Sequence, residues 1–216
     1  MSLKPPKKSD LGKAWLSKRS GKNIPIYPEY HLIVTEGTET EPLYFDAIKR
    51  RINSKFSDRI NLKVTGRGEN TTSLFYYAKE VAENGSYKHV WIVYDTDDFP
   101  KDKIDTVKLL CDESSTKSCE YHAIWSNQCI ELWYLLHFSY MHSDLHRNDY
   151  FPKLSKHLGF KYQKDNPDMF KILLPHLNTA LKNATKLDQD NAGKMPSQSK
   201  PGTKVFELIE RLKPYI

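Results

Sequence analysis

Short apolar runs and helical patterns alternate along the first two thirds of the chain. Runs rich in β-branched and aromatic residues, typical of strands, occupy residues 30–34, 61–65, 89–93 and 121–125. Between and after them, apolar residues recur at helical spacing, and a strongly apolar helix follows the fourth run. Because strands that alternate with helices pair in parallel, the pattern predicts an α/β fold with a mostly parallel sheet flanked by helices.

Turn and cap residues set the expected helix limits. Thr40 is predicted to cap a helix that reaches about Phe56, and residues 71–73 open a second helix that Asn84-Gly85 ends. A third helix is expected from Lys103 to about Glu113. Ser126-Asn127 is predicted to cap the apolar helix that carries Trp133.

The chain changes character near residue 141. A polar connector is followed by helical segments near 151–158, 168–187 and 204–212, the second interrupted by Pro175. Residues 188–202, rich in Gly, Pro, Ser and Gln, are predicted to be a mobile loop. The expected parts are a basic N-terminal arm (1–28), an α/β core (29–140) and a helical C-terminal extension packed on the core (141–216).

The net charge of +6 comes from the arm, which has seven Lys or Arg against Asp10. Subtraction from the totals of 33 and 27 leaves 26 basic and 26 acidic residues elsewhere. The arm is either a phosphate-binding element or a disordered solubilising leader.

No apolar run approaches the roughly 20 residues of a membrane span. The three cysteines form no C-x-x-C pair, so we expect a cytoplasmic protein. No Walker A sequence occurs, so P-loop chemistry is not expected.

An acidic cluster follows the third predicted strand. Asp95 and Asp97 are two residues apart and would point the same way on an extended backbone. A pair of carboxylates suits Mg²⁺ or Mn²⁺, although Asp is also a common turn residue. Glu36 follows the first strand. Since ligands bind beyond the carboxyl ends of parallel strands, these three acids are expected at one edge of the sheet.

Four stretches of the chain carry a family resemblance. They are residues 33–42 with Tyr44-Phe45; residues 90–99; residues 126–133 with 135–138; and residues 180–184 ahead of 203–206. In this order they resemble the RloB/AbiLii family, whose fold is a Toprim-like, Rossmann-like metal-binding domain. Gln128 and Ile130 depart from the family pattern, which has Pro and an aromatic residue there.

The resemblance implies a prokaryotic phage-defence protein of restriction or abortive-infection loci, often with an AAA- or ABC-type ATPase partner. In Toprim enzymes a Glu after the first strand and an Asp-x-Asp after the third bind divalent metal for phosphodiester chemistry. These roles carry over to Glu36, Asp95 and Asp97 as catalytic and metal-binding residues, with Mg²⁺ or Mn²⁺ as cofactor. The implied activity is a nuclease acting on DNA or RNA, tRNA included.

Two other functions remain open: a non-catalytic Toprim-like subunit that binds nucleic acid or regulates an ATPase, and a metal-dependent enzyme for a small phosphorylated compound. Further candidate residues lie outside the acidic cluster. Glu131, expected on the same helix face as Asn127, is either a metal ligand or an anchor for the loops. Arg67, in a Gly-rich turn, and Lys182 and Lys186, on one helix face, are candidate nucleic-acid contacts whose alternative is ordinary solvation.

Deletion of residues 1–22 is expected to leave the fold intact, because the segment has no apolar periodicity. Nucleic-acid affinity should fall and depend less on salt, since fewer phosphate contacts release fewer counterions. Thermal unfolding and binding at several salt concentrations measure the two effects. A large loss of thermal stability would show instead that the arm packs on the body.

Overall fold

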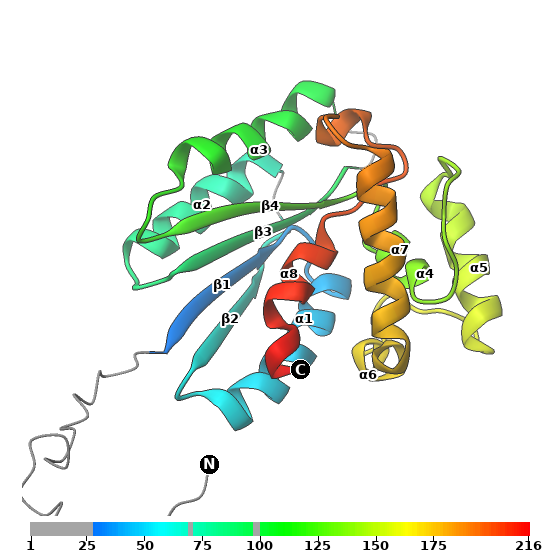
Figure 1. The fold of residues 1–216 in the computed structure, drawn as a ribbon, viewed down its shortest axis with the longest axis horizontal. Coiled ribbons are helices and arrows are strands. Elements are labelled where there is room, and N and C mark those ends of the chain that lie inside the picture. Colours follow the sequence, from blue (N-terminus) through cyan, green and yellow to red (C-terminus); the bar gives the residue numbers. More distant parts are fainter. Residues whose placement is uncertain (1–27, 69–70, 97–99) are drawn as a thin grey trace, which may run out of the picture.

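A parallel sheet of four strands forms the centre of the computed structural model, which describes residues 28–68, 71–96 and 100–216 (Figure 1). Each strand extends its predicted run by one or two residues. The order β2-β1-β3-β4 and the parallel pairing confirm the predicted α/β class and fit a Rossmann-like fold. The strands are β1 (Glu29–Thr35), β2 (Ile60–Gly66), β3 (His89–Asp95) and β4 (Glu120–Ser126).

The sheet has a topological switch point between β1 and β3. Helix α1 (Thr40–Phe56) links β1 to β2, and α2 (Thr71–Glu83) then carries the chain back across β1 to β3. The buried side of α1 belongs to one hydrophobic core, whereas α2 and α3 (Lys101–Ser114) line the other. The connections that leave β1 and β3 therefore run to opposite faces, and this divergence is where open α/β sheets bind ligands.

Alternation along the strands supplies both cores. Ile33 faces the α1 side, whereas Leu32 and Val34 face α2 and α3. The α1 side also buries the apolar faces of the C-terminal helices, so the residues after 140 share a core with the sheet (Figure 1). These helices are α4 (Glu131–Leu136), α5 (Arg147–Leu158), α6 (Met169–Leu173), α7 (Leu177–Asp190) and α8 (Val205–Leu212), with 3₁₀ turns at Leu174–His176, Pro196–Gln198 and Lys213–Tyr215.

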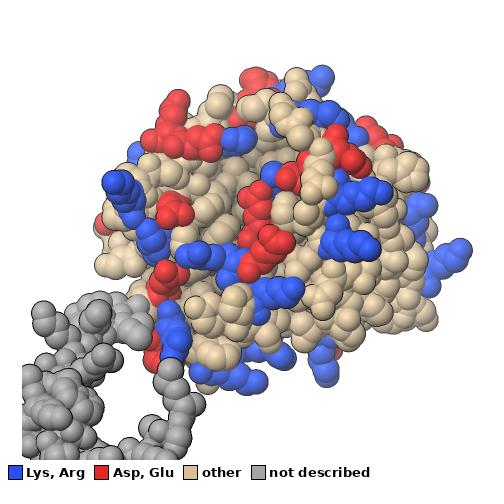
Figure 2. Space-filling model, viewed as in Figure 1, with Lys and Arg blue, Asp and Glu red and all other residues tan. Residues whose placement is uncertain are grey.

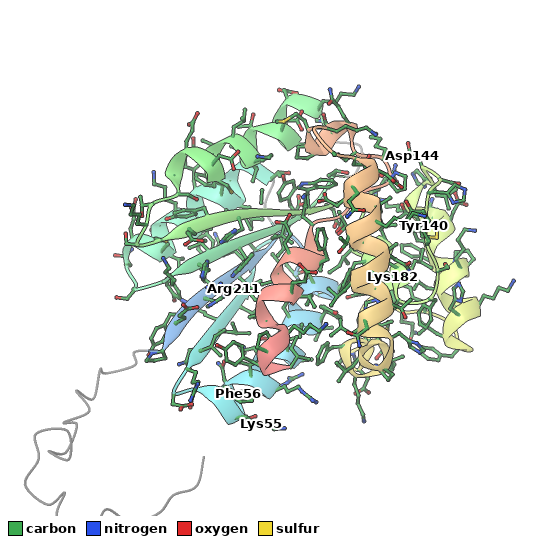
Figure 3. All side chains as sticks on the ribbon, in the orientation of Figure 1. Lys55, Phe56, Tyr140, Asp144, Lys182 and Arg211 are labelled. Carbon is green, nitrogen blue, oxygen red and sulfur yellow. The ribbon has the colours of Figure 1, made fainter. Side chains whose placement is uncertain are left out.

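Charged side chains of both signs are interspersed on the face that carries α7 and α8 (Figure 2). The last turn of the chain is fixed to the end of α1, where Phe56 packs edge-on against Tyr215 with ring centroids 5.5 Å apart (Figure 3). Arg51 Nε donates to the carbonyl of Ile216 at 2.6 Å. Within the described residues, no helix combines the length and apolarity needed to cross a membrane.

Two predicted helix caps are wrong. Thr40 is the first residue of α1, and Glu39 takes the N-cap position without a side-chain hydrogen bond. Asn127 does not cap α4, which begins at Glu131. Tertiary hydrogen bonds hold Asn127 instead, since its N–H donates to the Gly202 carbonyl at 2.8 Å and its own carbonyl accepts from the Tyr150 hydroxyl at 3.0 Å. Partners distant in sequence therefore override the local capping preference.

Residues 188–202, predicted to be a mobile loop, include the end of α7 and a 3₁₀ turn at Pro196–Gln198 that packs against α3. The Ser197 N–H and hydroxyl donate to the two carboxylate oxygens of Asp105 at 2.9 and 2.7 Å. Asn191 Nδ2 donates to the Pro201 carbonyl at 2.8 Å within the segment. The segment ends at Gly202, whose carbonyl accepts a hydrogen bond from the N–H of Asn127, the residue that follows β4.

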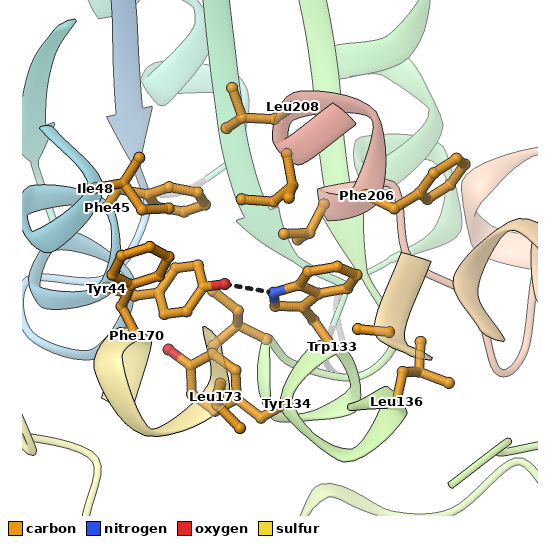
Figure 4. Packing of buried hydrophobic residues seen from close by; sticks show 14 of the residues in the cluster. Tyr44, Phe45, Ile48, Trp133, Tyr134, Leu136, Phe170, Leu173, Phe206 and Leu208 are labelled. Carbon is orange, nitrogen blue, oxygen red and sulfur yellow. Dashed lines mark hydrogen bonds between the residues drawn. The ribbon is translucent and has the colours of Figure 1, made fainter. Parts of the chain in front are cut away.

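One hydrogen bond joins two aromatic side chains in the middle of the larger core. Trp133 Nε1 donates to the Tyr44 hydroxyl at 3.0 Å, and both side chains are buried (Figure 4). Tyr134, next to Trp133, is equally buried, yet its hydroxyl has no hydrogen-bond partner among the described residues. Tyr44 and Tyr134 are therefore neighbours in one core that differ in whether the hydroxyl is paired.

Tyr44→Phe should lower the free energy of unfolding by about 1–3 kcal/mol, because it strands the buried Trp133 N–H. Tyr134→Phe is the matched control and should be neutral or stabilising, since it removes a hydroxyl that pays desolvation without a partner. Urea unfolding of the two variants beside the wild type measures both changes. Equal losses in the two variants would contradict the assigned hydrogen bond.

Candidate active site

Glu36 and Asp95 meet at the switch point of the sheet. The β1–β3 ladder pairs Thr35 with Val93, and the Glu36 N–H extends it by donating to the Val93 carbonyl at 2.9 Å. Glu36 Oε2 accepts from the backbone N–H of Asp95 at 3.1 Å. Both residues are partly buried. The predicted proximity of these two acids is therefore present, and the Glu36 carboxylate joins the ends of β1 and β3 rather than only capping its own turn.

Asp97, the third acid predicted here, lies outside the described residues, as do Glu69 and Asn70 of the Gly-rich turn and residues 1–27 of the arm. The paired-aspartate geometry and the role of the arm therefore stay predictions. Asp95 itself ends β3, where the ladder to β4 pairs it with Ser126. Its backbone is held by β4 on one side and by the Glu36 carboxylate on the other.

A buried polar network that sequence reasoning missed lies beside Asp95. The Thr96 N–H donates to the Ser126 carbonyl at 3.0 Å, and Asn127 Nδ2 donates to the Thr96 hydroxyl at 3.1 Å. The Asn127 amide oxygen is buried and has no hydrogen-bond partner in the described part of the chain. Ser126 and Thr203 share a further hydroxyl hydrogen bond of 2.8 Å, which ties β4 to the returning C-terminal segment.

Glu131 is the first residue of α4. Its carboxylate is buried, and Oε1 accepts from the Tyr162 hydroxyl at 2.9 Å. Burial, followed by the charges of Glu131 and Asp95, raises the pKa of the Cys129 thiol far above its usual range. Cys129 therefore keeps its proton and is not a nucleophile. The same interactions indicate that Cys129 lies near both acids.

Glu41, in the first turn of α1, is a buried acid. A Cβ at Gly37 would lie 2.2 Å from Glu41 Oε2, so the carboxylate occupies the space that the glycine leaves. Gly66 permits a second close approach, because a Cβ there would meet the Gly37 carbonyl oxygen at 2.7 Å. The turns after β1 and β2 therefore pack together against the end of the sheet.

Arg67 lies at this edge, where its N–H donates to the Thr35 carbonyl at 3.1 Å and its guanidinium stacks 4.0 Å above the ring of Tyr77. Lys182, labelled in Figure 3, and Lys186 are exposed on α7, and the Lys186 ammonium lies 4.3 Å above the ring of Tyr140. The structure therefore brings Arg67 to the carboxyl edge, whereas the two lysines belong to a separate helix. Nucleic-acid binding by all three stays a prediction.

The donors at the carboxyl edge fit a hard divalent cation in their chemistry. Glu36, Asp95 and the unpaired amide oxygen of Asn127 are the oxygen ligands that Mg²⁺ and Mn²⁺ prefer. Among the described residues, these oxygen atoms do not form a group of three acids, histidines or cysteines with ligand atoms close to one another. Such groups occur there only at the opposite edge of the sheet. The carboxyl edge therefore offers ligands of suitable chemistry, and a metal ion there stays a prediction.

The model of the RloB family, described as RloB-like protein, matches residues 31–212, a span that runs from β1 to the end of α8. The chain belongs to the RloB-like family. No curated protein and no solved structure matches it. The family match confirms the resemblance carried by the four sequence stretches, and it includes every site residue discussed above. In this RloB-like chain, the aromatic and acidic residues around Glu131 are part of the matched region.

If Glu131 anchors the loops, Tyr162→Phe should lower the free energy of unfolding by about 1.5–3 kcal/mol, because a buried hydrogen bond to a carboxylate is lost. Tyr140→Phe is the matched control, since the Tyr140 hydroxyl donates to Asp190 at the surface. That change should cost less than about 1 kcal/mol. Chemical unfolding of both variants measures the difference, and equal losses would contradict the anchoring role.

Glu131→Gln separates the anchor from the metal ligand. The Gln side chain keeps an oxygen that can accept from Tyr162, so an anchoring residue should leave Mn²⁺ affinity unchanged. A ligand should not, because an amide oxygen carries no charge to offset the cation. Calorimetric titration with Mn²⁺ decides between them.

Proposed function

We propose that this RloB-like protein is a Mg²⁺- or Mn²⁺-dependent nuclease with its active site at the carboxyl edge of the sheet. The observation that carries the proposal is the junction of Glu36 and Asp95. The two acids come from strands whose connections diverge to opposite faces, and a 3.1 Å hydrogen bond joins the Glu36 carboxylate to the Asp95 N–H. Such a divergence is the usual ligand site of an open α/β sheet.

A divalent ion held at this edge would supply an activated water and neutralise charge at the scissile phosphate. Asp95 would hold that ion, together with Asp97 and the Asn127 amide oxygen. The Asp95 backbone is fixed by its pairing with β4, so its carboxylate extends from a strand and not from a loop. Glu36 would share the ion or accept the proton of the attacking water as a general base.

The proposed substrate is DNA or RNA, tRNA included, because the proposed chemistry breaks phosphodiester bonds. Arg67 lies at the edge itself and would contact a phosphate near the cleavage point. Lys182, Lys186 and the basic arm would bind phosphates farther along the strand. Family membership supports a role in anti-phage defence, which we place in the cytoplasm, and the proposed partner is an AAA- or ABC-type ATPase.

A second candidate is a non-catalytic regulatory or nucleic-acid-binding subunit of an ATPase-containing defence complex. The engagement of Glu131 with Tyr162 favours it, as does the lack of a converged three-ligand group at the carboxyl edge within the described residues. The two candidates differ in one respect that can be measured, which is whether the chain cleaves nucleic acid when metal and partner are present.

Glu36→Gln should lower the cleavage rate by about 10²–10⁴-fold, the usual loss for a general acid or base. Gln keeps an acceptor for the Asp95 N–H, so folding and substrate binding should survive. Glu39→Gln is the matched control, because Glu39 is exposed in the same turn and makes no side-chain cap. Cleavage is measured on DNA and RNA panels with Mg²⁺, Mn²⁺ or EDTA, with and without the ATPase.

Wild-type turnover in a folded Glu36→Gln variant would make Glu36 a structural residue and overturn its catalytic role. Absence of cleavage by the wild type under every condition, ATPase included, would overturn the nuclease and leave the non-catalytic subunit.

A further inference from the structure

A second group of potential ligands lies at the amino edge of the sheet, at the opposite end of the strands from Glu36 and Asp95. The register places His31 of β1 beside His89 of β3, and His89 beside Glu120 of β4. His122 follows on the same face of β4 and stacks on the ring of Trp91, with centroids 4.0 Å apart. Neighbouring strands therefore bring three imidazoles together.

Three ligand atoms converge within this group. His89 Nδ1 lies 3.1 Å from His122 Nε2 and 3.5 Å from Glu120 Oε2, and the last two atoms are 4.0 Å apart. The ligand atoms of a tetrahedral zinc ion, bound at about 2.0–2.2 Å, lie about 3.3 Å from one another. The observed separations are close to this value, so side-chain shifts of less than about an ångström would complete the geometry.

A hydrogen bond already joins two of these ligand atoms. Arg211 Nη2 can only donate, so His89 Nε2 accepts from it and the ring proton of His89 lies on Nδ1, which donates to His122 Nε2 at 3.1 Å. The two ring nitrogens therefore converge on one point before any metal binds.

The geometry points to a Zn²⁺ site formed by His89, Glu120 and His122, with the fourth position open to solvent. Imidazole nitrogens with one carboxylate suit zinc, whereas the all-oxygen donors at the carboxyl edge suit Mg²⁺ or Mn²⁺. The side chain of His89 is 4% exposed, but those of His122 and Glu120 are 25% and 41% exposed. His89 is thus the buried ligand of the site, and solvent reaches the site past His122 and Glu120.

Two flanking charges orient the ligands. Lys88 Nζ lies 3.2 Å from Glu120 Oε1, which leaves Oε2 directed at His89 and His122. On the other side of His89, Arg211 Nη2 of α8 donates to Nε2 at 2.8 Å and lies 3.2 Å from Glu29 Oε2 (Figure 3). Glu29 Oε2 is also 4.0 Å from His89 Nε2.

This arrangement gives Arg211 and Glu29 opposite effects on zinc. Zinc on Nδ1 moves the remaining proton of His89 to Nε2, where it faces the Arg211 donor. Arg211 can then no longer donate to Nε2 and keeps only Glu29 as its partner. Glu29 becomes the acceptor for the Nε2 proton of the metal-bound ring. Arg211 therefore opposes zinc binding, whereas Glu29 favours it.

Competition between the untagged full chain and a chromogenic chelator measures Zn²⁺ affinity, with millimolar Mg²⁺ present to occupy the carboxyl edge. The wild type should bind one equivalent. His122→Ala should weaken binding more than about a hundredfold, beyond the 10–100-fold typical of an outer-shell partner, and Glu29→Gln should weaken it about tenfold. Arg211→Gln should tighten binding. His157→Ala, which removes an exposed imidazole on α5, should change nothing.

Co²⁺ locates the ion independently, because a tetrahedral site gives it an intense visible spectrum. The spectrum should persist in Asp95→Ala and disappear in His122→Ala. Glu120→Gln, at a more exposed position, replaces His122→Ala if that variant does not fold. Equal affinity in wild type and His122→Ala or Glu120→Gln would overturn the site, as would loss of the Co²⁺ spectrum in Asp95→Ala. Because nuclease activity is not a readout, failure here is distinct from failure of the proposed function.

Discussion

The pairing of β1 with β3 is the constraint on which the rest of the molecule depends. The chain reaches β3 only after β2 and α2, yet β3 lies directly against β1, so the helices on either side of this pair cover opposite faces. The Glu36 backbone N–H continues the pairing, and the Glu36 carboxylate accepts a hydrogen bond from the Asp95 N–H. One ladder thus builds the sheet, separates the two cores and joins the two acids.

The same strands carry different ligand chemistry at their two ends. At the carboxyl edge, β1 and β3 lead into Glu36 and Asp95, and Asn127 adds an unpaired amide oxygen. At the amino edge, β3 and β4 contribute His89, Glu120 and His122. Hard oxygen donors and imidazoles prefer different cations. The two proposed metal sites would therefore differ in the cation that they prefer.

Much of the fold could be predicted from the sequence because the signals are local. Runs of β-branched and aromatic residues located each strand to within one or two residues, and the rule for carboxyl ends of parallel strands brought Glu36 to Asp95. The cap at Asn127 failed because Gly202 and Tyr150, distant in sequence, supply its hydrogen bonds.

Other parts of the sites were invisible for a related reason. Each histidine at the amino edge is isolated in its own strand, and only the register of β1, β3 and β4 brings His31, His89 and His122 together. Glu41 follows the pattern of a first-turn helix acid, and only the space left by Gly37 shows that its carboxylate is enclosed. No sequence spacing encodes these contacts. A search for His, Asp and Glu at matched depths in successive predicted strands is the one signal that could have found the amino edge.

Titration of the full chain with Mn²⁺, with unbound ion followed by electron paramagnetic resonance, tests the central claim most directly. The claim is that the carboxyl edge, at the junction of β1 and β3, holds a hard divalent cation. The account predicts saturable binding in the wild type and in Asp112→Ala, a change at an exposed acid of α3, and its loss in Asp95→Ala. Binding of equal affinity and stoichiometry in a folded Asp95→Ala variant would contradict it.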